Sequence, residues 1–278
     1  MVIVDNGSTD ESRSIIASFE DRLPLTYVFE PKAGKNTALN TGLASVSGDL
    51  VVLTDDDAFP RTDWLVRLRE VADSRPTFGI FGGVVLPRWE TEPPAWFLKW
   101  VQHAPACGIS NTNQPEGPTN GHHLFGPNMA VRAEIFQAGH RFDQSIGPTS
   151  SPSYAMGSET EFTLRMIRQG VRAWYAPTAM VDHLVRKTQM QRSWLLRRAM
   201  RFGRGQCRLA LQLPPCSAGR CFGIPLYLLY QIARKAAGVL VAILLFDRQK
   251  LFHRRWVLSY VCGYALEARA SSKGTVAR

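Results

Sequence analysis

Short apolar runs alternate with longer amphipathic segments over the first ninety residues. The runs are rich in β-branched and aromatic residues and end in turn or acidic residues, a pattern typical of strands. They are residues 1–4, 25–30, 50–55 and 78–86. The segments between them are residues 8–23, 35–47 and 62–74. In the last of these, Trp64, Leu68 and Val71 recur at helical spacing. The alternation predicts an α/β fold with a parallel sheet flanked by helices, which binds ligands at the carboxyl ends of its strands.

The sequence is irregular between residues 87 and 153. Residues 87–100 and 111–128 are rich in Pro, Gly and Asn, which predicts long loops over a cleft. Regular patterns return further on. We expect a strand that leads into a short helix at 129–139, a helix at 158–170 and a strand at 173–183.

The last third of the chain has a different character, which predicts two domains, residues 1–185 and 186–278. Residues 222–246 are almost continuously apolar and are interrupted by Arg234 and Lys235. Each half of this run is shorter than the roughly 20 apolar residues that cross a bilayer. A charged pair at the centre of a bilayer would also cost several kcal/mol. We therefore expect helices that lie in the headgroup region of a membrane, with a buried pair of core helices as the alternative.

The net charge of +10 is unevenly distributed along the chain. From Leu184 onward there are 18 Lys or Arg residues against two acids, Asp247 and Glu267, whereas the preceding 183 residues carry 15 bases and 21 acids. A basic tail favours a polyanionic surface as a partner. An anionic membrane is favoured over nucleic acid, because the arginines are interleaved with aliphatic runs rather than with aromatic stacking platforms.

The cysteines and the glycine-rich stretches exclude several classes of site. The five cysteines have neither CxxC nor Cys/His metal spacing, which favours plain thiols in a reducing compartment. They are Cys107, Cys207, Cys216, Cys221 and Cys262. There is no GxGxxG fingerprint and no Walker A loop in the sequence.

Three adjacent carboxylates follow the apolar run at residues 50–53. They are Asp55, Asp56 and Asp57. Carboxylates at the end of a strand suit a hard divalent ion such as Mg²⁺ or Mn²⁺, which keeps several waters and shares its remaining positions with the phosphates of a substrate. A solvated acidic turn is the alternative interpretation.

Two further motifs are expected to place polar side chains at the same edge of the sheet. In VDNGSTD, Asp5 and Asn6 place a carboxylate and an amide where they can bind a pyrimidine or a ribose hydroxyl. In GKNTALNTG, Lys35 precedes two amides, Asn36 and Asn40, which lie on one face of a helix and suit a base, a ribose or a diphosphate. The alternatives are a capped helix after a strand and an amphipathic helix with a solvated lysine.

Two candidate residues come later in the chain. Glu159 lies in the first turn of the predicted helix at 158–170, directly after a loop, and is a candidate general base. Glu161 and Arg165 are spaced i, i+4 and are expected to pair. His183 follows a strand, where a single histidine is more often structural than a ligand.

Taken in order, five motifs resemble those of the family 2 glycosyltransferases, whose GT-A fold implies a mixed, mostly parallel sheet flanked by helices. The resemblance covers roughly residues 1–185. The motifs are VDNGSTD, GKNTALNTGL with SGDLVVLTDDDAFP, GPNMAVRAEIF, GSETEFTLRMIRQG and VDHLV. The resemblance implies an inverting transfer of a sugar from a UDP-, GDP- or dTDP-sugar to a glycan or lipid-linked acceptor. The basic, apolar C-terminal region adds the cytoplasmic face of the cell membrane as the place of action, which suits cell-surface polysaccharide synthesis.

The resemblance also implies roles for individual residues. Asp5, Asn6 and Lys35 would contact the nucleotide. Asp55 and Asp57 would bind Mg²⁺ or Mn²⁺ and the diphosphate of the donor, with Asp56 turned toward the sugar or ribose. The catalytic base would be Glu159, and His183 would be an additional metal ligand.

The chain departs from the family pattern in two places. The family usually has a strand and a helix before the VDNGS strand, so we expect a truncated start that leaves an unpaired sheet edge. Ser158 stands where the family's catalytic motif has its first acid. Two alternatives therefore stay open: a non-catalytic, truncated, membrane-associated homologue, and a nucleotidyltransferase of related fold.

Overall fold

The computed structural model describes residues 1–211 and 219–274, so Cys216 lies outside the described residues. The chain forms two compact units. The first comprises Met1–Val84, Thr112–Pro152 and Ser158–Val181. The second comprises Val85–Asn111, Ser153–Gly157 and Asp182–Arg278. The predicted division after residue 185 stays a prediction.

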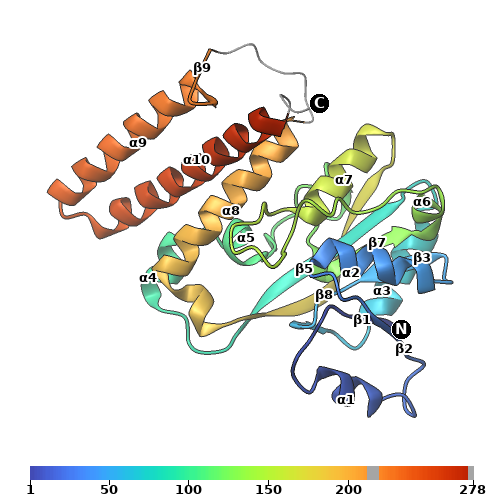
Figure 1. Cartoon of the computed structure of the whole chain (residues 1–278). Helices are drawn as coiled ribbons and strands as arrows, with labels where there is room; N and C mark the ends of the chain where they lie inside the picture. The colour runs from blue at the N-terminus through green and yellow to red at the C-terminus, as the bar shows by residue number, and fades with distance from the viewer. Residues whose placement is uncertain (212–218, 275–278) are drawn as a thin grey trace. The chain divides into compact units, whose positions relative to one another are not determined.

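The strands form a six-stranded sheet and two small sheets (Figure 1). The large sheet has the order β3-β7-β5-β8-β4, and β6 pairs with β8. Its strands are β3 (Leu50–Leu53), β4 (Ala58–Pro60), β5 (Ile80–Trp89), β6 (Gly117–Thr119), β7 (Met129–Arg132) and β8 (Ala173–Val185). One small sheet pairs β1 (Val2–Asp5) with β2 (Thr26–Phe29) in parallel. The other pairs β9 (Arg220–Cys221) with β10 (Ile224–Pro225) in antiparallel register.

Strand β7 makes the large sheet mixed, as the resemblance to the GT-A fold implies. It is antiparallel to β3, with Val131 opposite Val51, and antiparallel to β5, with Val131 opposite Ile80. Strands β3 and β5 therefore run in the same direction with β7 between them. No crossover helix among the described residues leads into β7. Strand β7 instead follows the irregular residues and the short helix η2 (Gly126–Asn128), which allows the strand to run against the direction of its neighbours.

The helices of the first unit follow the apolar period where it is strong. In α3 (Trp64–Ser74), Trp64, Leu68 and Ala72 are buried, as the helical spacing predicts. By contrast, only Ser12–Ala17 of the predicted helix at 8–23 is helical (α1), and α1 has no buried residue. The remaining helices of this unit are α2 (Lys35–Gly42), η1 (Leu43–Ser45), α6 (Ala133–Gln137) and α7 (Ser158–Arg168).

A single buried amide links three elements of the first unit. Asn128 accepts a hydrogen bond from Trp64 Nε1 on α3 at 2.8 Å. Its Nδ2 donates to the carbonyl oxygens of Val84 on β5 and Ala179 on β8, both at 2.9 Å. Because Asn128 is fully buried, each of these bonds satisfies a group that water cannot reach.

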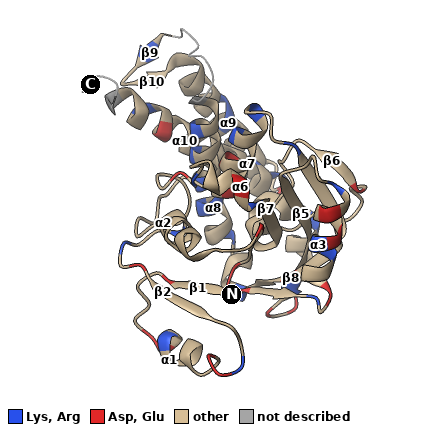
Figure 2. Ribbon diagram, turned by 90° about the vertical axis from the view of Figure 1, so that its right-hand side faces the viewer, with Lys and Arg blue, Asp and Glu red and all other residues tan. Residues whose placement is uncertain are grey.

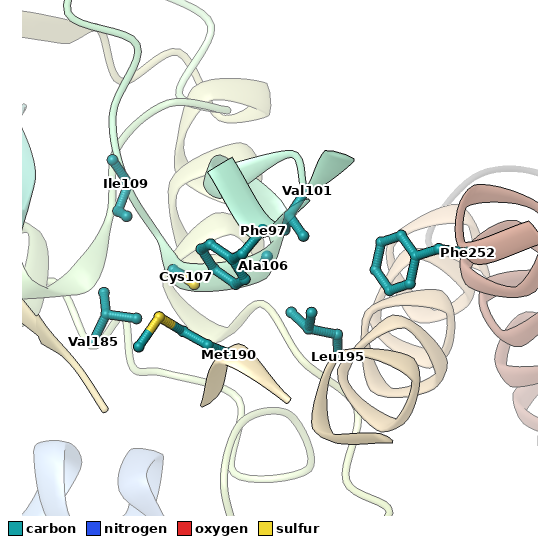
Figure 3. Packing of buried hydrophobic residues seen from close by; sticks show 9 residues of the cluster. All are labelled: Phe97, Val101, Ala106, Cys107, Ile109, Val185, Met190, Leu195 and Phe252. Carbon is teal, nitrogen blue, oxygen red and sulfur yellow. The ribbon is translucent and has the colours of Figure 1, made fainter. Parts of the chain in front are cut away.

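The regular elements of the second unit are helices, apart from the ends of β5 and β8 and the small sheet of β9 and β10. The stretch at 87–100, expected as a loop, contains α4 (Ala95–Trp100). That expectation was wrong because the aromatic residues of the stretch pack: Phe97 is buried in a cluster with Met190 and Leu195 (Figure 3). The other elements are α5 (His103–Cys107), η3 (Lys187–Met190), α8 (Arg192–Leu211), α9 (Leu226–Leu244) and α10 (Arg248–Gly274).

Helices α8 and α10 pack closely because two glycines lie where they cross. A Cβ atom on Gly203 would collide with the backbone carbonyl of Tyr260, and one on Gly263 with that of Met200. Beside this crossing, the buried carboxylate of Glu267 on α10 pairs with Arg208 at 2.6 Å and Arg204 at 3.3 Å on α8. The crossing is therefore fixed by shape and by charge.

Helix α9 is the one helix of the described residues that is long and apolar enough to cross a membrane by length and composition. A core helix of a soluble protein can have the same length and composition, but it is mostly buried. Only 17% of the apolar stretch of α9 is buried, so α9 differs from such helices.

Candidate active site

The three aspartates lie in the turn between β3 and β4, at the end of the predicted strand. The Ala58 N–H donates to the Asp55 carbonyl oxygen at 3.2 Å, which closes the turn. Asp56 is exposed, whereas Asp55 and Asp57 are half-buried. Just before them, Thr54 Oγ1 donates to the carbonyl oxygen of Pro127 at 3.1 Å. The turn is thus held next to the segment that leads into β7.

Lys35, at the start of α2, joins two acids that are distant in sequence. Its Nζ lies 2.7 Å from Asp55 Oδ1 and 2.6 Å from Glu159 Oε1. Lys35 is 25% exposed, Asp55 26% and Glu159 15%. The structure therefore brings together one residue from each of three sequence motifs in a partly buried ion triad.

The triad fixes the charge states of Lys35 and Glu159. Burial alone would lower the pKa of Lys35, but the nearby charges of Glu159 and Asp55 outweigh burial and raise that pKa above its usual value. Burial would raise the pKa of Glu159, yet the Lys35 ammonium holds that pKa below its usual value. Both groups are therefore ionised at neutral pH.

Glu159 is positioned by two residues whose role the sequence does not reveal. Ser158 Oγ donates to Glu159 Oε2 at 3.0 Å, so the serine that replaces the motif's first acid supports the carboxylate. The other residue is Gly126, whose position leaves no room for a Cβ atom beside that carboxylate. The sequence signals for Gly126 are its place before a proline and at the start of the GPNMAVRAEIF motif.

Asp5 and Asn6 are engaged within the first unit. Asp5 is buried and accepts hydrogen bonds from Ser8 N at 2.8 Å and Tyr27 Oη at 2.7 Å. These bonds lower the pKa of Asp5 below its usual value, the Ser8 N–H contributing most. The Asn6 side chain donates to the carbonyl oxygens of Glu30 and Lys32, and its Oδ1 accepts from the Gly34 N–H. Asn6 thereby shapes the loop that leads to Lys35.

Asn40 also bonds to the backbone of the same unit. Its Nδ2 donates to the Phe142 carbonyl oxygen at 2.8 Å, and its Oδ1 accepts from the Phe142 N–H at 2.9 Å. Asn36 donates to the carbonyl oxygens of Asp143 and Ile146. The amides on α2 therefore hold residues 142–146 against that helix. The predicted donor contacts of Asp5, Asn6 and Asn40 stay predictions.

His183 lies on β8 in the second unit. Its Nδ1 is 3.1 Å from the carbonyl oxygen of Cys107 in the same unit. Its predicted part in a metal site stays a prediction.

The aspartate turn fits a divalent metal of one particular kind. Within residues 1–211 and 219–274 there is no group of three or more His, Cys, Asp or Glu side chains placed to hold an ion. Mg²⁺ and Mn²⁺ are commonly held by one or two carboxylates together with phosphates and water. The Asp55 oxygen already faces a cation, Lys35 Nζ. The two half-buried carboxylates, Asp55 and Asp57, are therefore compatible only with an ion that completes its coordination with a bound diphosphate.

Comparison with curated proteins finds related glycosyltransferases. Glucosyl-dolichyl phosphate glucuronosyltransferase of Haloferax volcanii is 23% identical over 222 residues, which cover 78% of this chain and 69% of the relative. Pre-mycofactocin glycosyltransferase of Mycobacterium tuberculosis is 26% identical over 226 residues, 78% of this chain but 44% of the relative. The chain thus spans less than half of the second relative.

Solved structures share the fold. Mannosyltransferase PcManGT from Pyrobaculum calidifontis aligns with a TM-score of 0.54 and 22% identity over 99% of this chain and 65% of its own. TarS of S. aureus aligns with a TM-score of 0.50 and 13% identity over 98% of this chain and 82% of its own. These likenesses support the GT-A fold.

The family model "Glycosyl transferase family 2" matches residues 1–139, half of the 278 residues. This segment includes Lys35 and the aspartate turn, while Glu159 follows it. The protein belongs to the family 2 glycosyltransferases.

Proposed function

We propose that this protein is an inverting glycosyltransferase that moves a sugar from a UDP-, GDP- or dTDP-sugar to a lipid-linked or glycan acceptor at the cytoplasmic face of the cell membrane, in the synthesis of cell-surface polysaccharide. The observation that carries the proposal is the triad of Lys35, Asp55 and Glu159. It combines an acid for a donor-bound metal, a cation for a diphosphate and a buried carboxylate for proton transfer.

Glu159 acts as the general base. Its carboxylate accepts the proton of an acceptor hydroxyl while the hydroxyl oxygen forms a bond to the anomeric carbon of the sugar. The bond from that carbon to the diphosphate oxygen breaks on the opposite face, so the configuration inverts and the nucleoside diphosphate leaves. Because Lys35 keeps Glu159 ionised, the base is ready to take up a proton.

Lys35 and the aspartate turn act on the leaving group. The Lys35 ammonium can move from the acids to the diphosphate, whose growing charge it stabilises. Asp55 and Asp57 would hold Mg²⁺ or Mn²⁺, which supplies electrostatic stabilisation of the leaving diphosphate when bound. In support, the solved mannosyltransferase of similar fold carries GDP-Man and Mn²⁺, and TarS carries UDP-GlcNAc.

The acceptor class rests on one relative and on the C-terminal helices. The Haloferax relative is named for glucosyl-dolichyl phosphate, a lipid-linked sugar. The exposed apolar helix α9 supports work at a membrane, where such an acceptor resides.

Replacement of Glu159 by Gln tests the base. The amide keeps the size of the side chain but cannot take up a proton, so transfer should fall by about 10²–10⁴-fold. Donor binding should change little, as measured by calorimetry with UDP-, GDP- and dTDP-sugars and Mn²⁺. The matched control is Glu134→Gln, an exposed glutamate on α6 that should leave transfer unchanged. Unchanged transfer by Glu159→Gln, or equal loss of donor affinity, would contradict the base role.

Replacement of Asp57 by Ala tests the metal site. We expect the Mn²⁺ dependence of donor binding to be lost, with Asp21→Ala, an exposed aspartate, as the control. The same Mn²⁺ dependence in Asp57→Ala and wild type would remove Asp57 from the metal site. If no nucleotide-sugar binds the wild-type chain, the non-catalytic alternative is favoured.

A further inference from the structure

Helix α9 presents one continuous apolar face to solvent. Residues on this face recur every three or four positions and are exposed from one end of the helix to the other. They are Leu226, Tyr230, Ala233, Ala237, Leu240, Val241 and Leu244. The opposite face, with Leu228, Gly238 and Ala242, is buried, and α10 packs against α9. A helix of 19 residues is about 28 Å long, so the face is a long apolar stripe.

A phenylalanine stands at each end of this stripe in an unusual backbone conformation. Phe222 has φ 51° and is 85% exposed, and Phe246 has φ 50° and is 91% exposed. Among the described residues these are the two non-glycine residues with positive φ. Such a conformation is unfavourable for a bulky residue, by about 1–3 kcal/mol, and points to a functional constraint. Both side chains are almost fully exposed, so neither packs onto the described part of the protein.

A basic cavity begins one residue after Phe246. It has a volume of about 530 Å³ and lies between α9 and α10. Its charged lining is Lys235 from α9, Asp247 just before α10, and Lys250 and Arg254 from the first turns of α10. Figure 2 shows that Lys and Arg recur along α8 and α10.

The single carboxylate that lines this cavity, Asp247, is paired with Lys250. One Asp247 oxygen accepts from the Lys250 N–H at 2.9 Å, and the other lies 3.1 Å from Lys250 Nζ. Across the cavity, the Arg254 guanidinium lies against Gly238 of α9, where a Cβ atom would displace it. Within residues 1–211 and 219–274, no carboxylate forms an ion pair with Lys235 or Arg254. Two cations from facing helices, Lys235 and Arg254, thus line the same hollow.

These features fit a helix that lies among lipid headgroups better than one that spans the bilayer. Arg234 and Lys235 lie in the middle of α9, where a spanning helix would place them near the centre of the bilayer at a cost of several kcal/mol. A helix that lies flat keeps its apolar stripe in the acyl boundary and its cations among headgroups. A phosphate diester is the anion that headgroups supply, and Arg and Lys bind it by charge-assisted hydrogen bonds.

We propose that the cavity between α9 and α10 binds the phosphate of an anionic phospholipid through Lys235 and Arg254, while the α9 stripe and Phe246 insert into the same bilayer. The inference rests on the proposed function in that it specifies how the enzyme reaches a membrane-borne acceptor. It needs no sugar chemistry, so a vesicle assay tests it separately.

The full-length chain is tested by sedimentation with vesicles of phosphatidylcholine alone or mixed with phosphatidylglycerol. We expect binding to the mixed vesicles. Removing both cavity cations, in Lys235→Gln with Arg254→Gln, should weaken that binding about 30-fold, since each basic residue near an anionic surface contributes about 1 kcal/mol. Arg248→Gln with Arg255→Gln removes equal charge from exposed positions of α10 outside the cavity and should weaken it only a few-fold.

Insertion of the stripe is tested by Leu244→Ser with Phe246→Ser, which should weaken vesicle binding at least ten-fold. Leu65→Ser, an exposed apolar residue on α3, is the control and should have no effect. The single variant Lys235→Gln, together with circular dichroism of each protein, separates lost binding from lost folding.

Four results would overturn the proposal. The first two are equal losses of vesicle binding in the cavity and control pairs, and equal binding to neutral and mixed vesicles. The third is binding of free inorganic phosphate as tightly as vesicles. The fourth is self-association of the chain that the stripe variant abolishes, with no vesicle binding. Normal donor binding alongside failed vesicle binding would reject this inference and leave the proposed chemistry intact. The converse would reject the chemistry alone.

Discussion

At the scale of single residues, the candidate base depends on neighbours that carry no catalytic chemistry of their own. Ser158 donates a hydrogen bond to Glu159, and Gly126 leaves the space that the Glu159 carboxylate fills. These contacts give two ways to disturb the base without removing it.

Replacement of Gly126 by Ala should displace the Glu159 carboxylate from Lys35. The end of a flexible side chain can move aside, so we expect a small loss of stability and a fall in kcat of about 10- to 100-fold, as for a misplaced catalytic group. Steady-state kinetics with donor calorimetry measures this, since donor affinity should hold. Gly48→Ala is the control, because its Cβ atom would meet nothing closer than 3.8 Å. Equal kinetics in the two variants would mean that Gly126 does not position the base.

Asp5 links the stability of the first unit to pH. Its pKa is lowered in the folded state, so its contribution is complete above the ordinary pKa of an aspartate and is lost as the pH falls through the folded-state value. Asp5→Asn should therefore lower the free energy of unfolding by about 1 kcal/mol at neutral pH and by less at about pH 3. Urea unfolding at both pH values measures the difference. A constant difference between the two proteins would show that the charge of Asp5 is not what matters.

At the scale of elements, α8 and α10 are joined by a buried carboxylate. Glu267 is almost fully buried and pairs with Arg204 and Arg208 of the neighbouring helix. Such a pair is costly to break because the remaining charges lose their partner in a site that water hardly reaches.

Glu267→Gln should lower the free energy of unfolding by about 2–3 kcal/mol, a discount from a fully buried pair because both arginines are partly exposed. Asp73→Asn is the matched control, since its pair with Arg69 is exposed on both sides and should contribute at most about 0.5 kcal/mol. Chemical unfolding curves of both variants decide the question. Similar losses would mean that burial of Glu267 adds nothing to its pairing.

The sequence predicts elements well where one face is strongly apolar, and poorly elsewhere. The spacing of Trp64 and Leu68 identifies α3, whereas residues 18–23 have helix-compatible composition but no buried face and are not helical. For residues 87–100 the sequence predicts a loop because the stretch contains several prolines. The residues that bury Phe97, Met190 and Leu195, are distant in sequence, so local patterns do not reveal the packing that forms α4.

The same limit applies to the site. Lys35, Asp55 and Glu159 were each identified from a local motif, and the structure brings them together. Their mutual distances follow from the sheet topology, which local patterns do not encode. Likewise, the sequence does not indicate that the amides of Asn6 and Asn40 bond to the backbone of distant loops, because either could equally face a ligand.

At the scale of the whole molecule, charge is divided between the two ends of the chain. The residues from Leu184 onward carry 18 bases and two acids, whereas the preceding residues are net acidic. A molecule with this asymmetry is oriented by an anionic surface before any specific contact forms.

Binding to anionic vesicles should therefore weaken steeply with salt. The screening length falls from about 10 Å at 0.1 M to about 3 Å at 1 M salt, which removes attraction between charges that are not in contact. We expect residual binding at high salt from the apolar stripe alone, measured by sedimentation across a salt series. Binding that does not change with salt would attribute the interaction to the stripe and none of it to charge.

The glycines at the crossing of α8 and α10 have a consequence for recognising related chains. A Cβ atom on Gly203 or Gly263 would collide with backbone atoms of the facing helix, and backbone cannot move aside as a side chain can. A related chain that keeps the two helices this close is expected to have glycine at both positions. The pair, which stands as FGRG on α8 and VCGY on α10, therefore tests whether a relative keeps this crossing in the region that follows the segment matched by the family model.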